Sequence, residues 1–172
     1  MFIVEFEGKK PKVHPSAFIA PGAWVIGDVT LEEDVNVWTG AVIRGDDDSV
    51  KIGARTTVLE NCVIEAPTGN PVSIGADTIV SHSAIIHGAT IGEGAIIGIG
   101  AIVLDRAEVG EGAIVGSGAL VSPRDIIPPR NLALGVPAKP IREVKEGEVA
   151  YMKREHKRTL SKAKIYKTIY GR

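Results

Sequence analysis

Four side chains with suitable chemistry for a metal site stand at related places in the sequence. Arg44, Glu65 and His87 each directly follow an isoleucine, and His82 lies five residues before His87. Imidazole and carboxylate groups are good zinc ligands, and three protein ligands with an open fourth position are typical of a catalytic zinc site. These residue types therefore allow a metal site made from His82, His87 and Glu65, provided that the fold brings them together.

The isoleucines that precede these side chains belong to a repeat of six residues. A branched aliphatic residue recurs at every sixth position, interrupted by two insertions and one deletion. A hexapeptide period is typical of a β-helix, in which each face of a triangular coil is one short strand. Isoleucine and valine together number 40 against 7 leucines, which also favours strands over helices. We therefore predict an all-β parallel β-helix of about six coils, with these inward residues: Val13, Ile19, Val25, Leu31, Val37, Ile43, Ile52, Val58, Ile64, Ile74, Val80, Ile86, Ile91, Ile97, Val103, Val109, Val115, Val121 and Ile127.

This repeat predicts which outward side chains stack on one another. Three hexads complete one coil, so Arg44, Glu65 and His87 fall into one outward column once the insertions are skipped. The insertions, residues 46–51 and 66–72, are expected to leave the prism beside this column as loops. The column is therefore a candidate cleft.

His82 falls near a different corner of the same coil as His87, so one chain does not easily aim both histidines at one ion. A cyclic trimer does, because it places the His82 edge of one chain against the His87 edge of the next. Simpler interpretations stay open at this point. Outward histidines are often only surface or interface groups, and Glu65 can form an ion pair with Arg44 that needs no metal.

Several motifs together resemble the gamma-class carbonic anhydrases and their short homologues, over about residues 10–145. They are the hexapeptide repeat, Arg44-Gly45-Asp46, the His82-x4-His87 pair and the stretch Gly135-Val-Pro-Ala-Lys139. The resemblance implies a left-handed parallel β-helix and a homotrimer that binds zinc, with iron as the alternative. It also implies that His87 and His82 reach one metal from adjacent chains, and that Arg44 and Asp46 form an ion pair between chains near it.

The sequence departs from the family pattern at the candidate site. Glu65 stands where the family has its first metal-binding histidine, Thr57 and Leu59 replace an asparagine and a glutamine, and Glu60 occupies the usual acidic position. The metal ligands are therefore predicted to be His82, His87 and Glu65, with Arg44, Asp46 and Glu60 as the catalytic set. A carboxylate ligand adds negative charge to the metal, so water bound there should be less acidic and hydration slower.

Three functions follow from these residues. The first is metal-dependent hydration of carbon dioxide to bicarbonate at a trimer interface, weakened by Glu65. The second is a non-enzymatic metal-binding trimer or a subunit of a larger assembly, in which Glu65 and Arg44 neutralise each other. The third is acyl transfer from coenzyme A with His82 or His87 as general base. Insertions of only three and four residues leave little from which to build an acceptor pocket for that third reaction.

Composition limits the organisation of the chain and its partners. We predict a repeat domain over residues 1–142, with residues 2–6 covering one end, and a C-terminal helix over residues 143–172. Residues 151–172 carry a net charge of +7 and the rest −8, which fits a solvated helix balancing an acidic body. No aromatic platform accompanies the basic residues and no apolar stretch approaches a membrane span, so nucleic-acid and membrane partners are not expected. The single cysteine, Cys62, is consistent with a cytoplasmic location.

Overall fold

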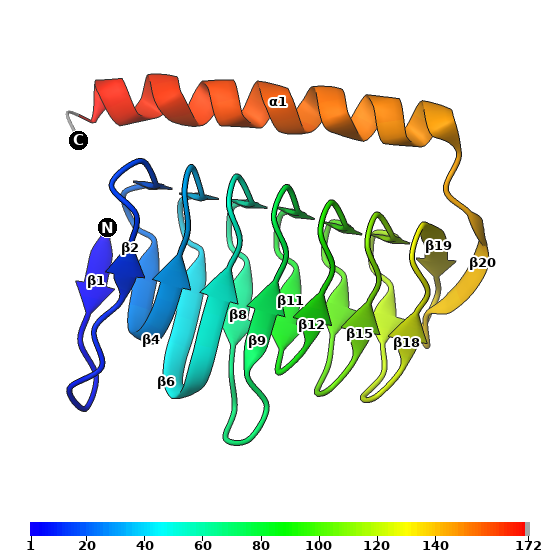
Figure 1. Cartoon of the computed structure of the whole chain (residues 1–172), viewed down its shortest axis with the longest axis horizontal. Coiled ribbons are helices and arrows are strands. Elements are labelled where there is room, and N and C mark those ends of the chain that lie inside the picture. Colours follow the sequence, from blue (N-terminus) through cyan, green and yellow to red (C-terminus); the bar gives the residue numbers. More distant parts are fainter. Residues whose placement is uncertain (171–172) are drawn as a thin grey trace.

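The computed structural model describes residues 1–170 and confirms a parallel β-helix with one long α-helix along its side (Figure 1). The strands form three faces, because six residues supply one short strand and one corner. Face 1 is one sheet, made of β3 (Phe18–Ile19), β5 (Asn36–Val37), β7 (Thr57–Val58), β10 (Ile79–Val80), β13 (Ile96–Ile97), β16 (Ile114–Val115), β19 (Asn131–Leu134) and the antiparallel β20 (Lys139–Glu143).

Faces 2 and 3 form a second sheet, joined where β4 (Trp24–Leu31) and β6 (Val42–Ile52) run around a corner. The first halves of β4 and β6 belong to face 2, together with β1 (Phe2–Val4), β8 (Val63–Glu65), β11 (Ile85–His87), β14 (Ile102–Val103) and β17 (Leu120–Val121). Their second halves belong to face 3, together with β2 (Lys12–Val13), β9 (Val72–Ile74), β12 (Thr90–Ile91), β15 (Glu108–Val109) and β18 (Ile126–Ile127).

The predicted inward residues form the core. From Ile19 to Ile127 each of them is at most 7% exposed, and only Val13 at the first coil is partly buried. The solenoid has about seven turns, one more than the repeat predicted. The extra turn contains β19, where Ala133 takes the inward place, so the pattern of branched residues does not extend to it.

A second buried row of small residues lies at a corner of the prism. It is made mostly of alanine, including Ala41 and Ala84, and Cys62 stands between them. The Cys62 Sγ lies 3.0 Å from the carbonyl oxygen of Ser81, and burial raises the pKa of the Cys62 thiol to about 12. A thiol in this environment stays protonated and has a structural role.

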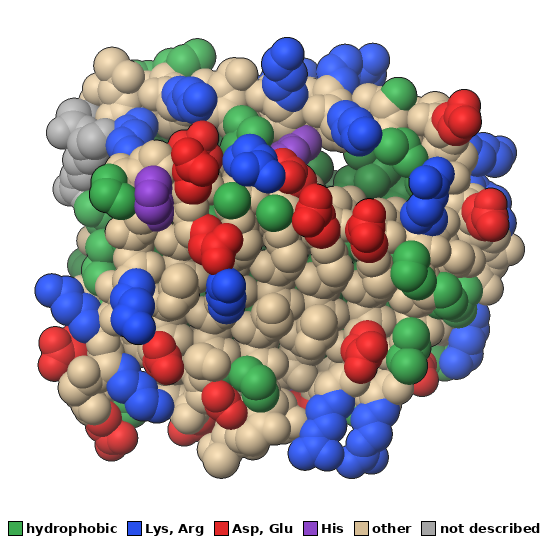
Figure 2. All heavy atoms as spheres, viewed as in Figure 1, with side chains coloured by type: hydrophobic (Ala, Val, Ile, Leu, Met, Phe, Trp, Pro, Cys, Tyr) green, Lys and Arg blue, Asp and Glu red, His purple; other side chains and the backbone are tan. Residues whose placement is uncertain are grey.

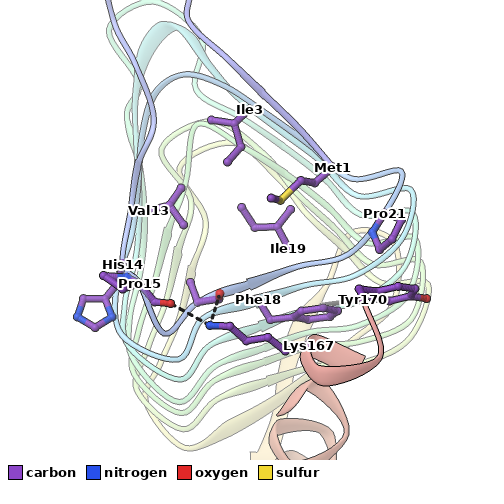
Figure 3. A pocket seen from close by; sticks show the side chains of 11 residues that line it. Met1, Ile3, Val13, His14, Pro15, Phe18, Ile19, Pro21, Lys167 and Tyr170 are labelled. Atoms are coloured by element: carbon purple, nitrogen blue, oxygen red, sulfur yellow. Dashed lines mark hydrogen bonds between the residues drawn. The ribbon is translucent and has the colours of Figure 1, made fainter. Parts of the chain in front are cut away.

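The first coil leaves an apolar cavity of about 310 Å³ at the mouth of the prism (Figure 3). Ile3, Val13 and Ile19 point into it, and β1 extends the second sheet by pairing with β4. The Lys167 ammonium closes one side by donating to the carbonyl oxygens of residues 15–17, at 2.8 to 3.3 Å.

The helix α1 (Glu146–Ile169) runs back along face 1, so that its end lies near the first coil (Figure 1). It begins three residues later than predicted, because Glu143 still pairs in β20. Glu148 caps its start: the carboxylate accepts the Lys145 N–H and two bonds from Arg142, all 2.8 Å long. These donors, that of Arg142 foremost, lower the pKa of Glu148 to about 2.

Lys and Arg side chains are spread along the side of the molecule where α1 lies (Figure 2). Among residues 1–170, no helix is long and apolar enough to cross a membrane. The proposed boundary between residues 142 and 143 stays a prediction, and residues 171 and 172 of the predicted helix lie outside the described part of the chain.

Candidate metal centre

The outward column forms as counted. Arg44 on β6 pairs in register with Glu65 on β8, and Glu65 pairs with His87 on β11. Each directly follows a fully buried isoleucine, so its side chain points away from the core. Three neighbouring coils therefore present a guanidinium, a carboxylate and an imidazole at one edge of face 2.

Arg44 forms ion pairs with two carboxylates, one of them in the column. Its Nε lies 3.2 Å from Asp46 Oδ2, and one terminal nitrogen lies 3.2 Å from Glu65 Oε1. The hydrogen bond to Asp46 raises the pKa of Arg44, with smaller contributions from the charges of Asp46 and Glu65. Arg44 and Asp46 thus pair within one chain, and Glu65 already has a cationic partner.

His87 has a carboxylate partner of its own. Its Nδ1 lies 3.1 Å from Asp105 Oδ1, and the imidazole is about one-third exposed. Asp105 was not predicted, although it lies two residues after Val103, the inward residue that pairs in register with Ile86. A hydrogen bond at Nδ1 fixes the ring and leaves Nε2 as the coordinating atom, which is how proteins commonly orient metal-binding histidines.

His82 lies in the turn between β10 and β11 and is half exposed. Its Nδ1 lies 2.8 Å from Glu60 Oε2, which makes Glu60 the counterpart of Asp105. The approach is close but not aligned for a hydrogen bond, since this buried oxygen has no hydrogen-bond partner among the described residues.

The first of the two insertions differs from the prediction. Residues 46–51 are not a loop: they belong to β6, which continues around the corner because Gly45 pairs with Gly27 and Val50 pairs with Val29. Residues 66–71 do form a loop, which protrudes between β8 and β9 (Figure 1). Asp48 ties the two segments together, because its carboxylate accepts the N–H of Gly69 at 3.1 Å. Only the second insertion can wall the column as a loop.

A single chain does not assemble the predicted ligand set. Glu65 and His87 are neighbours on paired strands, whereas His82 lies across face 2 from them. Within residues 1–170 no three His, Cys, Asp or Glu side chains are grouped closely enough to hold a metal ion. The donor chemistry nevertheless fits a zinc or iron ion, because each histidine has a carboxylate at Nδ1 and, among residues 1–170, no hydrogen-bond partner at Nε2.

Sequence reasoning also missed a groove beside His82. It lies between residues 151–162 of α1 and face 1, has a volume of about 510 Å³, and includes His82 and Glu60 in its wall. Outward isoleucines on face 1 form its floor. The sequence contains one sign of this floor, because a second apolar residue precedes several of the inward residues. The groove itself forms only because α1 lies over face 1.

Comparisons with known proteins agree with this architecture. The family model described as bacterial transferase hexapeptide (six repeats) matches residues 88–123. A carbonic anhydrase of Geobacillus kaustophilus is 41% identical over 167 residues, 97% of this chain and 92% of that protein. The mitochondrial gamma carbonic anhydrase 2 of Arabidopsis thaliana is 35% identical over 92% of this chain and 59% of its own length.

The solved structure of a hexapeptide transferase family protein from Anaplasma phagocytophilum superimposes with a TM-score of 0.92 and 33% identity, covering 96% of this chain and 98% of that one. The names of these relatives include both carbonic anhydrases and transferases, so the shared repeat does not by itself distinguish the two. The extent of the match to the carbonic anhydrases, together with the histidine pair and the Arg44-Gly45-Asp46 motif, shows that this chain belongs to the gamma carbonic anhydrase-like family of hexapeptide-repeat proteins.

Proposed function

We propose that the chain acts as a homotrimer that hydrates carbon dioxide, with a zinc or iron ion held between neighbouring chains. The observation that carries the proposal is the matched pair of histidines, each with a carboxylate near Nδ1 and with no partner at Nε2 in the described part of the chain. His87 and Glu65 would approach the ion from one chain and His82 from its neighbour. The carbonic anhydrase relatives indicate carbon dioxide and bicarbonate as substrate and product.

The bound metal would supply a Lewis acid that makes water a nucleophile near neutral pH. The residues of the chain would do the rest. Asp105 and Glu60 would hold the two imidazoles in one tautomer and orientation. Arg44 would hold Asp46 and Glu65 in place at the column, and at a trimer interface it could exchange one of these partners for a carboxylate of the next chain.

Two departures would slow this reaction. Glu65 carries a negative charge into the ligand set, which reduces the acidifying effect of the metal on water. Leu59 packs against the aromatic cluster under α1 and has no polar atom with which to orient water or bicarbonate. We therefore expect hydration to be slow near neutral pH and faster in alkali.

A non-enzymatic role is the second candidate, and one observation favours it. Glu65 Oε1 lies 3.2 Å from the Arg44 guanidinium, so the carboxylate has a partner without a metal. In this alternative the two histidines hold a metal only weakly, and the trimer serves as a metal-binding or assembly subunit. Negligible hydration with metal fully bound would favour it.

Mixed trimers test the shared site. H82A and H87A homotrimers should each lack intact sites, whereas trimers refolded from both chains should regain some, since one chain keeps His87 and its neighbour keeps His82. Sedimentation should give about three chains per particle. We would measure metal content of chelator-free preparations and hydration by stopped flow; a stable monomer, or mixed trimers no better than the parents, would contradict the shared site.

A further inference from the structure

The free strand edges at the last coil of the prism are protected on all three faces. A free edge pairs with another strand unless charge, proline or a further segment covers it. Face 1 ends in the antiparallel β20, which contains Pro140 and three charged residues. On face 2, residues 135–138 hydrogen-bond to both backbone groups of Leu120 and cover β17. On face 3, β18 is followed directly by two prolines, which have no N–H to donate.

The first coil leaves one strand edge unprotected. On face 3, β2 directly follows Pro11 and contains the exposed Lys12, and on face 1 the end of α1 packs over β3 through Ala163 and Phe18. The outermost strand on face 2 is β1, which pairs only with β4 and contains neither proline nor charge (Figure 1). Among residues 1–170, β1 is therefore the one end strand whose free edge has no such protection.

The backbone of β1 has the geometry to pair with a second copy of itself. The Phe2 N–H donates to the carbonyl oxygen of Ala23 at 2.8 Å, so the Phe2 backbone groups point toward β4. Successive residues of a strand direct these groups to opposite sides, so the N–H and C=O of Ile3 point away from the prism. Two β1 strands related by a twofold axis at Ile3 would exchange both hydrogen bonds between their Ile3 residues.

The side chains at this edge are apolar and exposed. The Phe2 ring is 47% exposed and stacks on the Trp24 ring at 4.1 Å, and Ile3 points into the apolar mouth of about 310 Å³ (Figure 3). The twofold pairing sets Phe2 opposite Val4 of the second copy, and aromatic residues opposite β-branched ones stabilise strand pairs. It also sets the two mouths face to face, which removes apolar surface from water.

We propose that two copies of this protein associate end to end, mouth to mouth, through antiparallel pairing of their β1 strands. The opposite ends are protected, so the assembly closes at two prisms in line and does not grow into a filament. One three-residue strand pairs weakly, but the proposed trimer would carry three such contacts that act together. Trimers would therefore pair into particles of six chains as the protein concentration rises, and only this number rests on the proposed function.

Sedimentation equilibrium of the full-length protein, from low micromolar to submillimolar concentration, tests the contact. The wild type should rise from three toward six chains per particle. Ile3→Pro should stay at three, because proline removes the outward N–H but no hydrogen bond to β4, and edge strands tolerate proline. Val4→Lys should also stay at three, because it sets a charge opposite Phe2 of the second copy. The control Ile141→Lys, at an exposed residue of β20 on the opposite end, should behave like the wild type.

Cysteine pairs test the register. Residues opposite each other in a non-hydrogen-bonded antiparallel pair have Cα atoms about 4.5 Å apart, which a disulfide can span. A mixture of F2C and V4C proteins, treated with oxidised glutathione, should therefore form cross-linked chain pairs on a non-reducing gel. Each variant alone should not, since its own cysteines lie two residues out of register. The buried Cys62 thiol stays protonated and should not react.

Failure of this inference can be told from failure of the proposed function. Wild-type particles that stay at three chains at every concentration overturn the end-to-end contact and leave the trimer intact. Particles that rise from one chain to two, and stay at one in Ile3→Pro, support the contact although the trimer fails. A rise to six chains that Ile3→Pro and Val4→Lys do not reduce, or cross-linking of F2C alone as strong as in the mixture, overturns the pairing through β1.

Discussion

The inward row and the outward column stand on the same strands but meet different constraints. Ile43, Ile64 and Ile86 are fully buried and interchangeable in kind, because each fills the same space in successive coils. The residues directly after them are Arg44, Glu65 and His87, which differ in charge and chemistry. The six-residue period therefore determines the core. The chemistry of the site depends on the outward residues, which differ from one coil to the next.

This difference predicts that stability and metal binding can be changed separately. Inward substitutions should lower the free energy of unfolding, because they leave cavities between close-packed coils. Outward substitutions should leave that free energy nearly unchanged and alter the site. The following changes test this separation, from the largest expected effect to the smallest.

Ile97→Ala should destabilise the fold most. Ile97 is fully buried in the inward row, and removing its branched side chain should cost about 2 to 4 kcal/mol through cavity formation. Urea unfolding would measure the loss. The neighbouring outward residue gives the control, since Ile96→Ala should cost about 1 kcal/mol or less; equal losses at the two positions would contradict the separation.

His82→Ala and His87→Ala should each lower retained metal to about a tenth or less, because each removes one coordinating nitrogen. The free energy of unfolding in chelator should change by about 0.5 kcal/mol or less. Elemental analysis after purification without an affinity tag measures the metal. His14→Ala is the control, since the His14 imidazole lies on the first coil and hydrogen-bonds Ser16 there. Tight metal binding by the double variant H82A/H87A would place the metal elsewhere.

Asp105→Asn should have a smaller effect on the same site. The amide keeps the shape of the side chain but loses the charge that orients and polarises His87 through its Nδ1. We expect metal affinity to fall about tenfold, measured by competition with a chelator. Asp125→Asn, at another exposed carboxylate, should leave affinity unchanged, and an unchanged affinity for Asp105→Asn would remove Asp105 from the site.

The smallest effect concerns the start of α1, which lies away from the inward row and from the outward column. Because donors lower the pKa of Glu148 from 4.5 to about 2, its contribution is fully present above pH 4.5 and is lost as the pH falls toward 2. Circular dichroism should show the helix losing signal over this interval. Glu148→Gln should remove most of that pH dependence; an identical acid transition in the variant would assign it to another carboxylate.

The sequence allowed the core and the column to be predicted, because both follow from counting in sixes. The repeat does not reveal the seventh coil, because Ala133 is not branched. It also does not reveal the strand over residues 46–51, because the pairing of that strand with β4 depends on a corner that the period does not describe. Asp105 and the groove depend on contacts between separate coils and with α1. Such contacts have no fixed spacing, so local pattern does not reveal them.

The most direct test of the proposed shared metal site is Glu65→His, assayed beside the wild type. This change restores three histidines at a stacked outward position without altering Ile64 in the core. With zinc or iron loaded to the same occupancy, stopped-flow hydration of carbon dioxide would be measured near neutral pH and in alkali. We predict slow wild-type hydration that rises in alkali, and tighter metal binding with faster neutral hydration in the variant; no hydration by either protein with metal fully bound would contradict the account.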